Sequence, residues 1–490
     1  MSPQVAGVAP RTPVLVGVGT DASGAPLTDL LTQAAQAAGD DCGAPSLLTA
    51  IERIHIPQGS WALTDPARGV ARRIGAPQAR THLYEVGVSQ QEVIDEALAA
   101  IADGSADVIL VIGGEARRYE RTAGPEPEPD DAQPPDVTVT RPPDFVAPIE
   151  IDAGIVWPPV QQYALIDTAL AHHEHLTAAT HRDQVASLWA RFNEVARHNP
   201  DAAFPAPRTA KDIATPGPKN RPLAHPYNLW HSSQWTVDQA SALLFCSAER
   251  ATAAGIATDR WVFPRVALHS SQAITLTARQ DLHAWPAMGI LGRTAATHLG
   301  IELNAIPHAE VYSCFPAAVR VQQRELGLDP NGTPTLTGGM SFAGGPFNNF
   351  VFLATATMAR SLRHHPDDLG LVTTVSGMLS KPGLAIWSGT PPTTVRPLLT
   401  ADLGDEAARH TAVLPVAATE QVSGPATVVS YTVTFDSDDP LRASRVAIVA
   451  DLADGRRASA TCDNASIAQA ALTESLIGQT VSLARTSFTL

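Results

Sequence analysis

An uninterrupted apolar run from Val108 to Gly114 restricts the possible folds of this chain more than any other feature. Such a run fits a strand that is buried on both faces, because neither set of alternating side chains is polar. Before it, apolar residues recur at helical spacing from Gln91 to Ala102, and Gly104 follows as a helix stop signal. A second run of this kind, Val14 to Gly19, lies near the N-terminus. A helix followed by a buried strand predicts an α/β fold.

This helix–strand pattern is used twice along the chain. Helical spacing returns at 286–299, 317–326 and 350–363, inside a series that runs from about residue 273 to 387. Between the two series lies a Pro- and acid-rich stretch, 125–143, which is typical of an exposed loop, and then a predicted helix from Gln184 to Arg197. We therefore predict two α/β units with a helical region inserted between them.

The C-terminal part has a different hydrophobic pattern, which is typical of β-strands. Residues 426–435 alternate with period two, 445–452 is a second strand-like run, and 477–483 is expected to be a closing strand. Asp454-Gly455 is a tight-turn signal between them. This pattern favours a small antiparallel barrel or sandwich.

Composition limits the partners of the protein. The 490 residues carry a formal net charge of −15, and no run of Lys or Arg stands out, so the footprint of a nucleic-acid-binding protein is missing. No apolar segment is long enough to span a bilayer, and the N-terminus has no basic region before a long apolar stretch. We expect a cytoplasmic protein without nucleic-acid or membrane partners.

Metal binding is not expected either. The four cysteines lie far apart without Cys-x-x-Cys spacing, which argues against a zinc site or a disulfide framework. The run from His172 to His175 contains three histidines, but neighbouring positions face different sides of a helix, so a solvated helix face is the favoured interpretation.

Four segments, in their order and spacing, resemble the thiolase superfamily, and in particular its sterol-carrier-thiolase-like branch with the thiolase-like proteins of type 1. They are Glu85–Gln91 with Ala106–Asp107 and Gly113–Glu115, Ala309–Phe315, Gly338–Pro346, and Thr373–Ser388. The resemblance implies a duplicated five-layered α/β fold with an inserted loop domain, to which this chain adds a C-terminal barrel of the oligonucleotide/oligosaccharide-binding type. The expected boundaries are 1–118 with 236–272 for the first half, 119–235 for the loop domain, 273–392 for the second half and 405–490 for the barrel.

The chain departs from the family at the positions that carry thiolase chemistry. The resemblance places the acyl-accepting cysteine at Gly87 and the histidine of a Gly-His-Pro element at Gly345. Tyr312-Ser313 stands where a thioester-binding Asn or His is usual, and the second family cysteine falls near Thr374 or Val375. None of these side chains is a thiolate or a base at neutral pH. Claisen condensation and thiolysis are therefore not expected.

The candidate site residues follow from the same comparison. Tyr312, Ser313, Cys314 and Ser89 are the candidate catalytic residues, and the segment of Cys314 lines the catalytic cavity of the family. The alternatives are a buried small apolar residue for Cys314 and a packed aromatic for Tyr312. Coenzyme A, or an acyl-CoA, is the suspected ligand, and the residues expected to bind it are Arg221, His225, Phe342 and Ser376.

Three functions remain open from the sequence. The first is an acyl-CoA-binding thiolase-like protein without thiolase activity. The second is a retro-aldol carbon–carbon lyase acting on a β-hydroxyacyl-CoA, because similar barrels partner thiolase-like chains in steroid-degrading aldolases. The third is an acyltransferase that uses Cys314 as its nucleophile. We expect a monomer or a homodimer.

Overall fold

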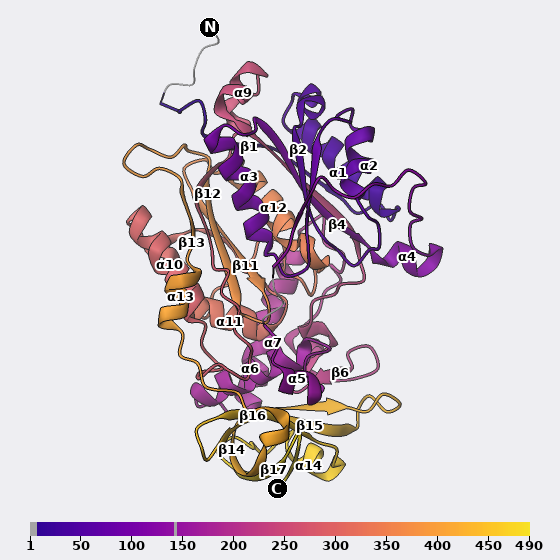
Figure 1. The fold of residues 1–490 in the computed structure, drawn as a ribbon, viewed down its shortest axis with the longest axis vertical. Helices are drawn as coiled ribbons and strands as arrows, with labels where there is room; N and C mark the ends of the chain where they lie inside the picture. Colours follow the sequence, from indigo (N-terminus) through magenta and orange to yellow (C-terminus); the bar gives the residue numbers. More distant parts are fainter. Residues whose placement is uncertain (1–6, 142–144) are drawn as a thin grey trace.

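The computed structural model describes residues 7–141 and 145–490, and three β-sheets organise them (Figure 1). The first sheet has the order β1-β8-β4-β2-β3-β5. Its strands are β1 (Pro13–Asp21), β2 (Arg53–Pro57), β3 (Arg80–Tyr84), β4 (Val108–Ala116), β5 (Val137–Val139) and β8 (Asp238–Ser247). Strand β4 is buried along its whole length, as its apolar run predicts.

The second sheet repeats the arrangement with later segments of the chain. Its order is β10-β11-β12-β9-β13. The strands are β9 (Phe263–His269), β10 (His308–Glu310), β11 (Leu369–Ser376), β12 (Lys381–Ser388) and β13 (Leu399–Asp402).

Helices form three layers around these two sheets. Helices α3 (Gln90–Asp103) and α12 (Phe350–His364) lie between the sheets and contact strands of both. Helices α1 (Leu27–Asp41) and α2 (Pro66–Arg73) cover the outer face of the first sheet, while α10 (Pro286–Leu299) covers the second, with α11 (Pro316–Glu325) beside it. The order helix, sheet, helix, sheet, helix confirms the predicted five-layered α/β fold.

Helix ends follow the signals in the sequence. Ser89 caps α3 by accepting a hydrogen bond from the Glu92 amide, and Gly104 ends the same helix in the left-handed conformation. Helix α10 begins with Pro286 and ends at Gly300 in the same way.

The inserted region is mostly helical. It contains α4 (Arg117–Ala123), α5 (Pro148–Asp152), α6 (Val160–His173), α7 (Ala178–Ala196) and α8 (Ala210–Ala214), with α7 covering the predicted helix. The short strands β6 (Pro222–Ala224) and β7 (Tyr227–Asn228) leave this region and join the C-terminal sheet. Over residues 7–141 and 145–490, the helices lack the combination of length and apolar character that crossing a bilayer requires.

Five strands close the C-terminal barrel, which lies at the lower end of Figure 1. They are β14 (Ser423–Phe435), β15 (Ala443–Leu452), β16 (Arg457–Cys462), β17 (Thr480–Ala484) and β18 (Ser487–Thr489). Strand β14 pairs with both β15 and β17, so the sheet returns on itself. Helix α13 (Gly404–His410) precedes the barrel and α14 (Ala465–Ala470) packs on β15. The predicted all-β, OB-like module is confirmed.

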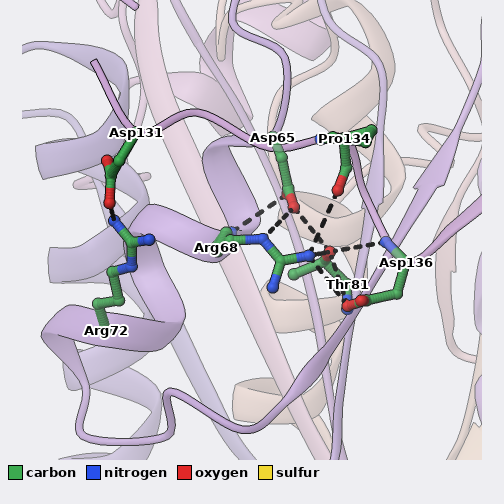
Figure 2. A network of polar contacts seen from close by, with 7 residues as sticks. All are labelled: Asp65, Arg68, Arg72, Thr81, Asp131, Pro134 and Asp136. Carbon is green, nitrogen blue, oxygen red and sulfur yellow. Dashed lines mark hydrogen bonds and ion pairs between the residues drawn. The ribbon is translucent and has the colours of Figure 1, made fainter. Parts of the chain in front are cut away.

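The Pro- and acid-rich stretch differs from the expected loop in one respect, because β5 within it extends the first sheet beyond β3. Figure 2 shows how it is held: Arg68 on α2 donates to the carboxylates of Asp65 and Asp136 and to the carbonyl of Pro134. The Thr81 amide donates to Asp136 at 2.8 Å. Strand β5 thereby covers the edge of β3 and becomes the edge strand of the first sheet. Residues 142 and 143 of the stretch lie outside the described residues.

Candidate functional site

The tip of α3 presents backbone and no reactive side chain. Gly87 has φ of +114°, a conformation that a residue with a side chain adopts only under strain. A Cβ atom there would lie 3.5 Å from the Arg141 carbonyl oxygen and 4.0 Å from Nζ of Lys381, so the position is open. Nζ of buried Lys381 donates a hydrogen bond to the Gly87 carbonyl. The candidate Ser89 is the helix cap, and its hydroxyl accepts from the Glu92 amide at 3.2 Å.

The space beside Gly345 is filled by a neighbouring side chain. A Cβ atom at Gly345 would lie only 1.9 Å from Oγ of Ser233 and 3.4 Å from the terminal carbon of Met340. The Ser233 amide donates to the Cys314 carbonyl at 2.9 Å, which ties this loop to the segment of candidate residues. A side chain therefore cannot be added at position 345 unless Ser233 moves.

Tyr312 and Cys314 belong to the segment that this loop contacts, and both are buried. The Tyr312 side chain hydrogen-bonds Gln90, the first residue of α3, and burial raises the pKa of its phenol. Burial also raises the pKa of the Cys314 thiol to about 12, although a hydrogen bond with Tyr163 opposes this. Both groups are consequently protonated at neutral pH. The position of Cys314 is that of an inert buried thiol and not of an activated nucleophile.

Ser313 and Phe342 have structural contacts. The Oγ atom of fully buried Ser313 accepts a hydrogen bond from the Met340 amide at 3.0 Å. The Phe342 ring is fully buried and stacks on Trp230 with centroids 6.3 Å apart. Neither side chain reaches a surface that a ligand could contact in this conformation.

The remaining predicted ligand-binding residues are divided between two places. Ser376 is half-buried at the end of β11, opposite Lys381 in the register of the sheet. Arg221 is exposed beside β6, whereas the His225 ring stacks on Tyr431 of the barrel at 6.3 Å. Burial lowers the pKa of His225 to about 4, so its imidazole is neutral at neutral pH and carries no charge toward a phosphate.

An exposed aromatic cluster flanks the loop of Ser233 and was not found from the sequence. Trp235 is 40% exposed and Trp157 is 66% exposed, with ring centroids 6.2 Å apart in an edge contact. The Arg117 guanidinium lies 3.7 Å over the Trp235 ring. We call these three residues the Trp157–Trp235–Arg117 cluster. They come from separate loops and a helix start, so no periodicity in the sequence could have joined them.

The histidines of the run from His172 to His175 do not gather around one point. His173 stacks on His283 with centroids 3.9 Å apart, at a cleft of about 570 Å³ between α6, the loop before α10 and the barrel. Glu174 pairs with Arg320. In the described part of the chain, no three His, Cys, Asp or Glu side chains are arranged to hold a metal ion.

Comparison with solved structures places this geometry among known proteins. The chain is similar to a monomeric SCP2-thiolase-like protein type 1 from Mycobacterium smegmatis, with 29% identity over 99% of this chain and 100% of that one and a TM-score of 0.82. It shares its fold with an Ltp2–ChsH2(DUF35) aldolase at 19% identity, covering 78% of this chain and 99% of that one, with a TM-score of 0.58. Human mitochondrial 3-ketoacyl-CoA thiolase in complex with CoA shares the fold at 16% identity, 78% and 100% coverage and a TM-score of 0.55.

No protein-family model matches the chain, and no curated protein matches it.

Proposed function

Because this chain belongs to the thiolase superfamily, in the branch of the SCP2-thiolase-like proteins of type 1, we propose that it binds acyl-CoA thioesters without thiolase activity. The observation that carries the proposal is the tip of α3, where Gly87 offers only backbone. Thiolase chemistry needs a thiolate there, because the helix dipole stabilises the anion that accepts the acyl group. A glycine cannot be acylated.

Two further contacts support the loss of condensation chemistry. Ser233 occupies the space that a side chain at Gly345 would need. The histidine of the family is absent, and a side chain at its position would also clash. Cys314, the remaining thiol in the site, is held protonated by burial. A thiol with a pKa near 12 has a negligible thiolate fraction at neutral pH, which argues against the acyltransferase alternative.

The Trp157–Trp235–Arg117 cluster supports coenzyme A as the ligand. Exposed indole rings stack on an adenine base, and a guanidinium pairs with phosphate oxygens. The cluster adjoins the site through the chain itself, since Ser233 contacts Cys314 and lies two residues before Trp235. In this proposal the nucleotide lies on the cluster and the acyl thioester extends toward Tyr312.

The test combines binding with turnover. Calorimetry with CoA, acetyl-CoA and acetoacetyl-CoA is expected to give binding heat, while product analysis and intact mass show neither thiolysis nor an acyl adduct. Trp235→Ala and Arg117→Gln should each weaken binding by about tenfold, and Arg409→Gln, which removes an exposed charge on α13, should not. Turnover of acetoacetyl-CoA, or the absence of heat with every ester, would refute the proposal.

A retro-aldol lyase is the second candidate, and the phenol of Tyr312 at the tip of α3 favours it. A protonated phenol there can donate a hydrogen bond to the thioester oxygen as negative charge develops during carbon–carbon cleavage. One structural neighbour with the same fold is an aldolase. Release of an aldehyde or ketone from a β-hydroxyacyl-CoA by the wild type, and its loss in Tyr312→Phe, would replace the binder with this enzyme.

A further inference from the structure

A small cavity of about 30 Å³ lies between the loop before α10 and the turn after β11. Its walls are mixed: Ile274, Trp285 and Leu379 are among the apolar lining residues, and Ser380 and Thr411 are among the polar ones. Arg279 and Asp281 supply its charged groups. Asp281 is exposed, so it lies at the solvent side, whereas Arg279 is 5% exposed and belongs to the interior.

Of the two terminal nitrogens of the Arg279 guanidinium, one is hydrogen-bonded and the other is not. Its Nη2 donates to the carbonyl of Met378 at 2.7 Å and to that of Ile274 at 3.4 Å. Its Nη1 is buried and has no hydrogen-bond partner among residues 7–141 and 145–490. The buried carboxylate whose charge acts on Arg279 is that of Glu150. Its oxygens accept hydrogen bonds from the amides of Thr277 and Ala147. Glu150 thus contributes charge but no hydrogen bond to Nη1. A buried N–H without an acceptor is costly, so this arrangement calls for a ligand that supplies the missing acceptor.

We propose that Arg279 and the cavity that it lines form a subsite for the carboxylate group of a ligand. A single carboxylate matches one open guanidinium nitrogen, and the apolar part of the lining suits the carbon atoms attached to it. A dianionic phosphate fits less well, because the cavity offers one cation beside the carboxylate of Asp281. Burial lowers the pKa of Arg279 only to about 10, so the side chain is charged at neutral pH.

Tyr163 interacts both with Arg279 of the subsite and with the segment of Tyr312 and Cys314. The Tyr163 phenol hydrogen-bonds the Cys314 thiol, and the charge of Arg279 acts on the same phenol. The carboxylate therefore has two sources: the far end of an acyl thioester, which rests on the proposed function, or a small free carboxylate. The shared chemistry is one carboxylate on a short carbon chain.

The C-terminal barrel holds this subsite in place. Arg457 on β16 donates to the carbonyls of Arg279 and of Gln280. The Thr277 hydroxyl hydrogen-bonds Ser459 of the same strand at 2.7 Å. The loop that carries Arg279 is thus braced from the barrel side.

The experiment compares charged and neutral ligands of equal size. Melting temperatures of the full-length protein are measured with butyrate and with butyramide, at matched ionic strength, for the wild type, Arg279→Met and Arg279→Lys. Arg265→Met is the control, because it removes another partly buried guanidinium that does not line the cavity. Butyrate is expected to stabilise the wild type and the control, to stabilise Arg279→Lys less, and to have no effect on Arg279→Met; butyramide should stabilise none of them.

A second arm identifies the source of the carboxylate. Glutaryl-CoA and valeryl-CoA have chains of equal length, and a charge-assisted hydrogen bond predicts about tenfold or tighter binding of glutaryl-CoA to the wild type but not to Arg279→Met. Equal binding of the two esters with a persisting butyrate effect assigns the subsite to a free carboxylate. Butyrate stabilisation without binding of either ester keeps the subsite and refutes the proposed function. The subsite is refuted if butyramide matches butyrate, or if Arg279→Met responds as the wild type does.

Discussion

Replacing Gly345 by alanine tests whether Ser233 has closed the family's histidine position. The added Cβ would lie 1.9 Å from Oγ of Ser233, well inside the ~3.5 Å of an ordinary nonbonded contact. If the hydroxyl rotates away, the Cβ of Ser233 is still only 3.2 Å distant, which leaves a tight contact. Overpacking of this kind costs about 1–3 kcal/mol, and partial relief by rotation sets our expectation at about 1–2 kcal/mol.

A double-mutant cycle isolates the contact. Ser233→Ala removes the clashing oxygen from a half-buried position and should change the free energy of unfolding by less than about 0.5 kcal/mol. The double variant Ser233→Ala/Gly345→Ala should recover about 1 kcal/mol of the loss, because the two changes share one contact. Urea unfolding followed by circular dichroism supplies the four values. Additive effects, or a neutral Gly345→Ala, would show that the space is not closed as described.

Gly87→Ala provides a contrast with a different cause. The nearest atom to its added Cβ is 3.5 Å away, so no neighbour obstructs it, but φ of +114° strains any residue with a side chain. We expect a loss of about 1–2 kcal/mol that no second substitution nearby recovers. Relief of the loss by Lys381→Met would contradict this explanation.

Three further outcomes follow from the structure. Iodoacetamide at mildly alkaline pH should label half-buried Cys462 well before Cys314, because burial raises the pKa of the Cys314 thiol to about 12; equal labelling rates would refute the assignment of an inert thiol. Light scattering should show a monomer, since β5 covers the edge of β3, and Arg68→Ala should promote self-association by releasing β5; a stable wild-type dimer would contradict this. Burial lowers the pKa of His231 from 6.5 to about 4, so the unfolded chain binds a proton that the folded protein does not, and up to about 3 kcal/mol of stability is lost as the pH falls from 6.5 to 4. Urea midpoints should fall less over this range in His231→Gln, whose wild-type ring accepts from the Asn228 amide, and an unchanged pH dependence would refute that origin.

Local periodicity was enough to predict the elements whose faces are uniform. Helix α3 was expected from Gln91 to Ala102 and extends from Gln90 to Asp103, and α10 has the predicted bounds. Their stop signals act within one turn of the chain, so no long-range contact is needed to place them. Strands β14, β15 and β17 of the barrel were predicted for the same reason, because alternation is also a local property, whereas the short strands β16 and β18 were not predicted.

Strand order and edge protection could not be obtained in this way. Strand β8 (Asp238–Ser247) pairs antiparallel with both β1 and β4, although more than a hundred residues separate it from β4. Strand β5 lies in a stretch whose composition indicates a loop, and it forms because Arg68 and Thr81 hold Asp136 at the sheet edge. Pairing partners that are distant in sequence leave no periodic signal.

The candidate site shows the same division. Motif spacing pointed to Gly87, Gly345 and the segment of Tyr312 and Cys314, and the structure brings Cys314 and Gly345 to the same loop through Ser233. Motif spacing did not point to Ser233, Tyr163 or Arg279. Each of these residues comes from a different part of the chain and acquires its role only from contacts made after folding. Phe342 was expected to bind the ligand but lies in the core. The sequence of a glycine-rich loop does not determine whether an aromatic ring in it faces a cavity or the interior.

The fused barrel bears on function through the loop that it braces. Arg457 is 3% exposed and directs its guanidinium at the backbone of Arg279 and Gln280, while its other side pairs with Asp451 of the barrel. Separating the barrel from the α/β core would leave these buried groups without partners, at a cost of about 1–3 kcal/mol for each. The same loop carries the Arg279 side chain into the cavity. The barrel therefore acts on the ligand site from behind, because Arg457 and Ser459 hold the loop whose side chains line the cavity.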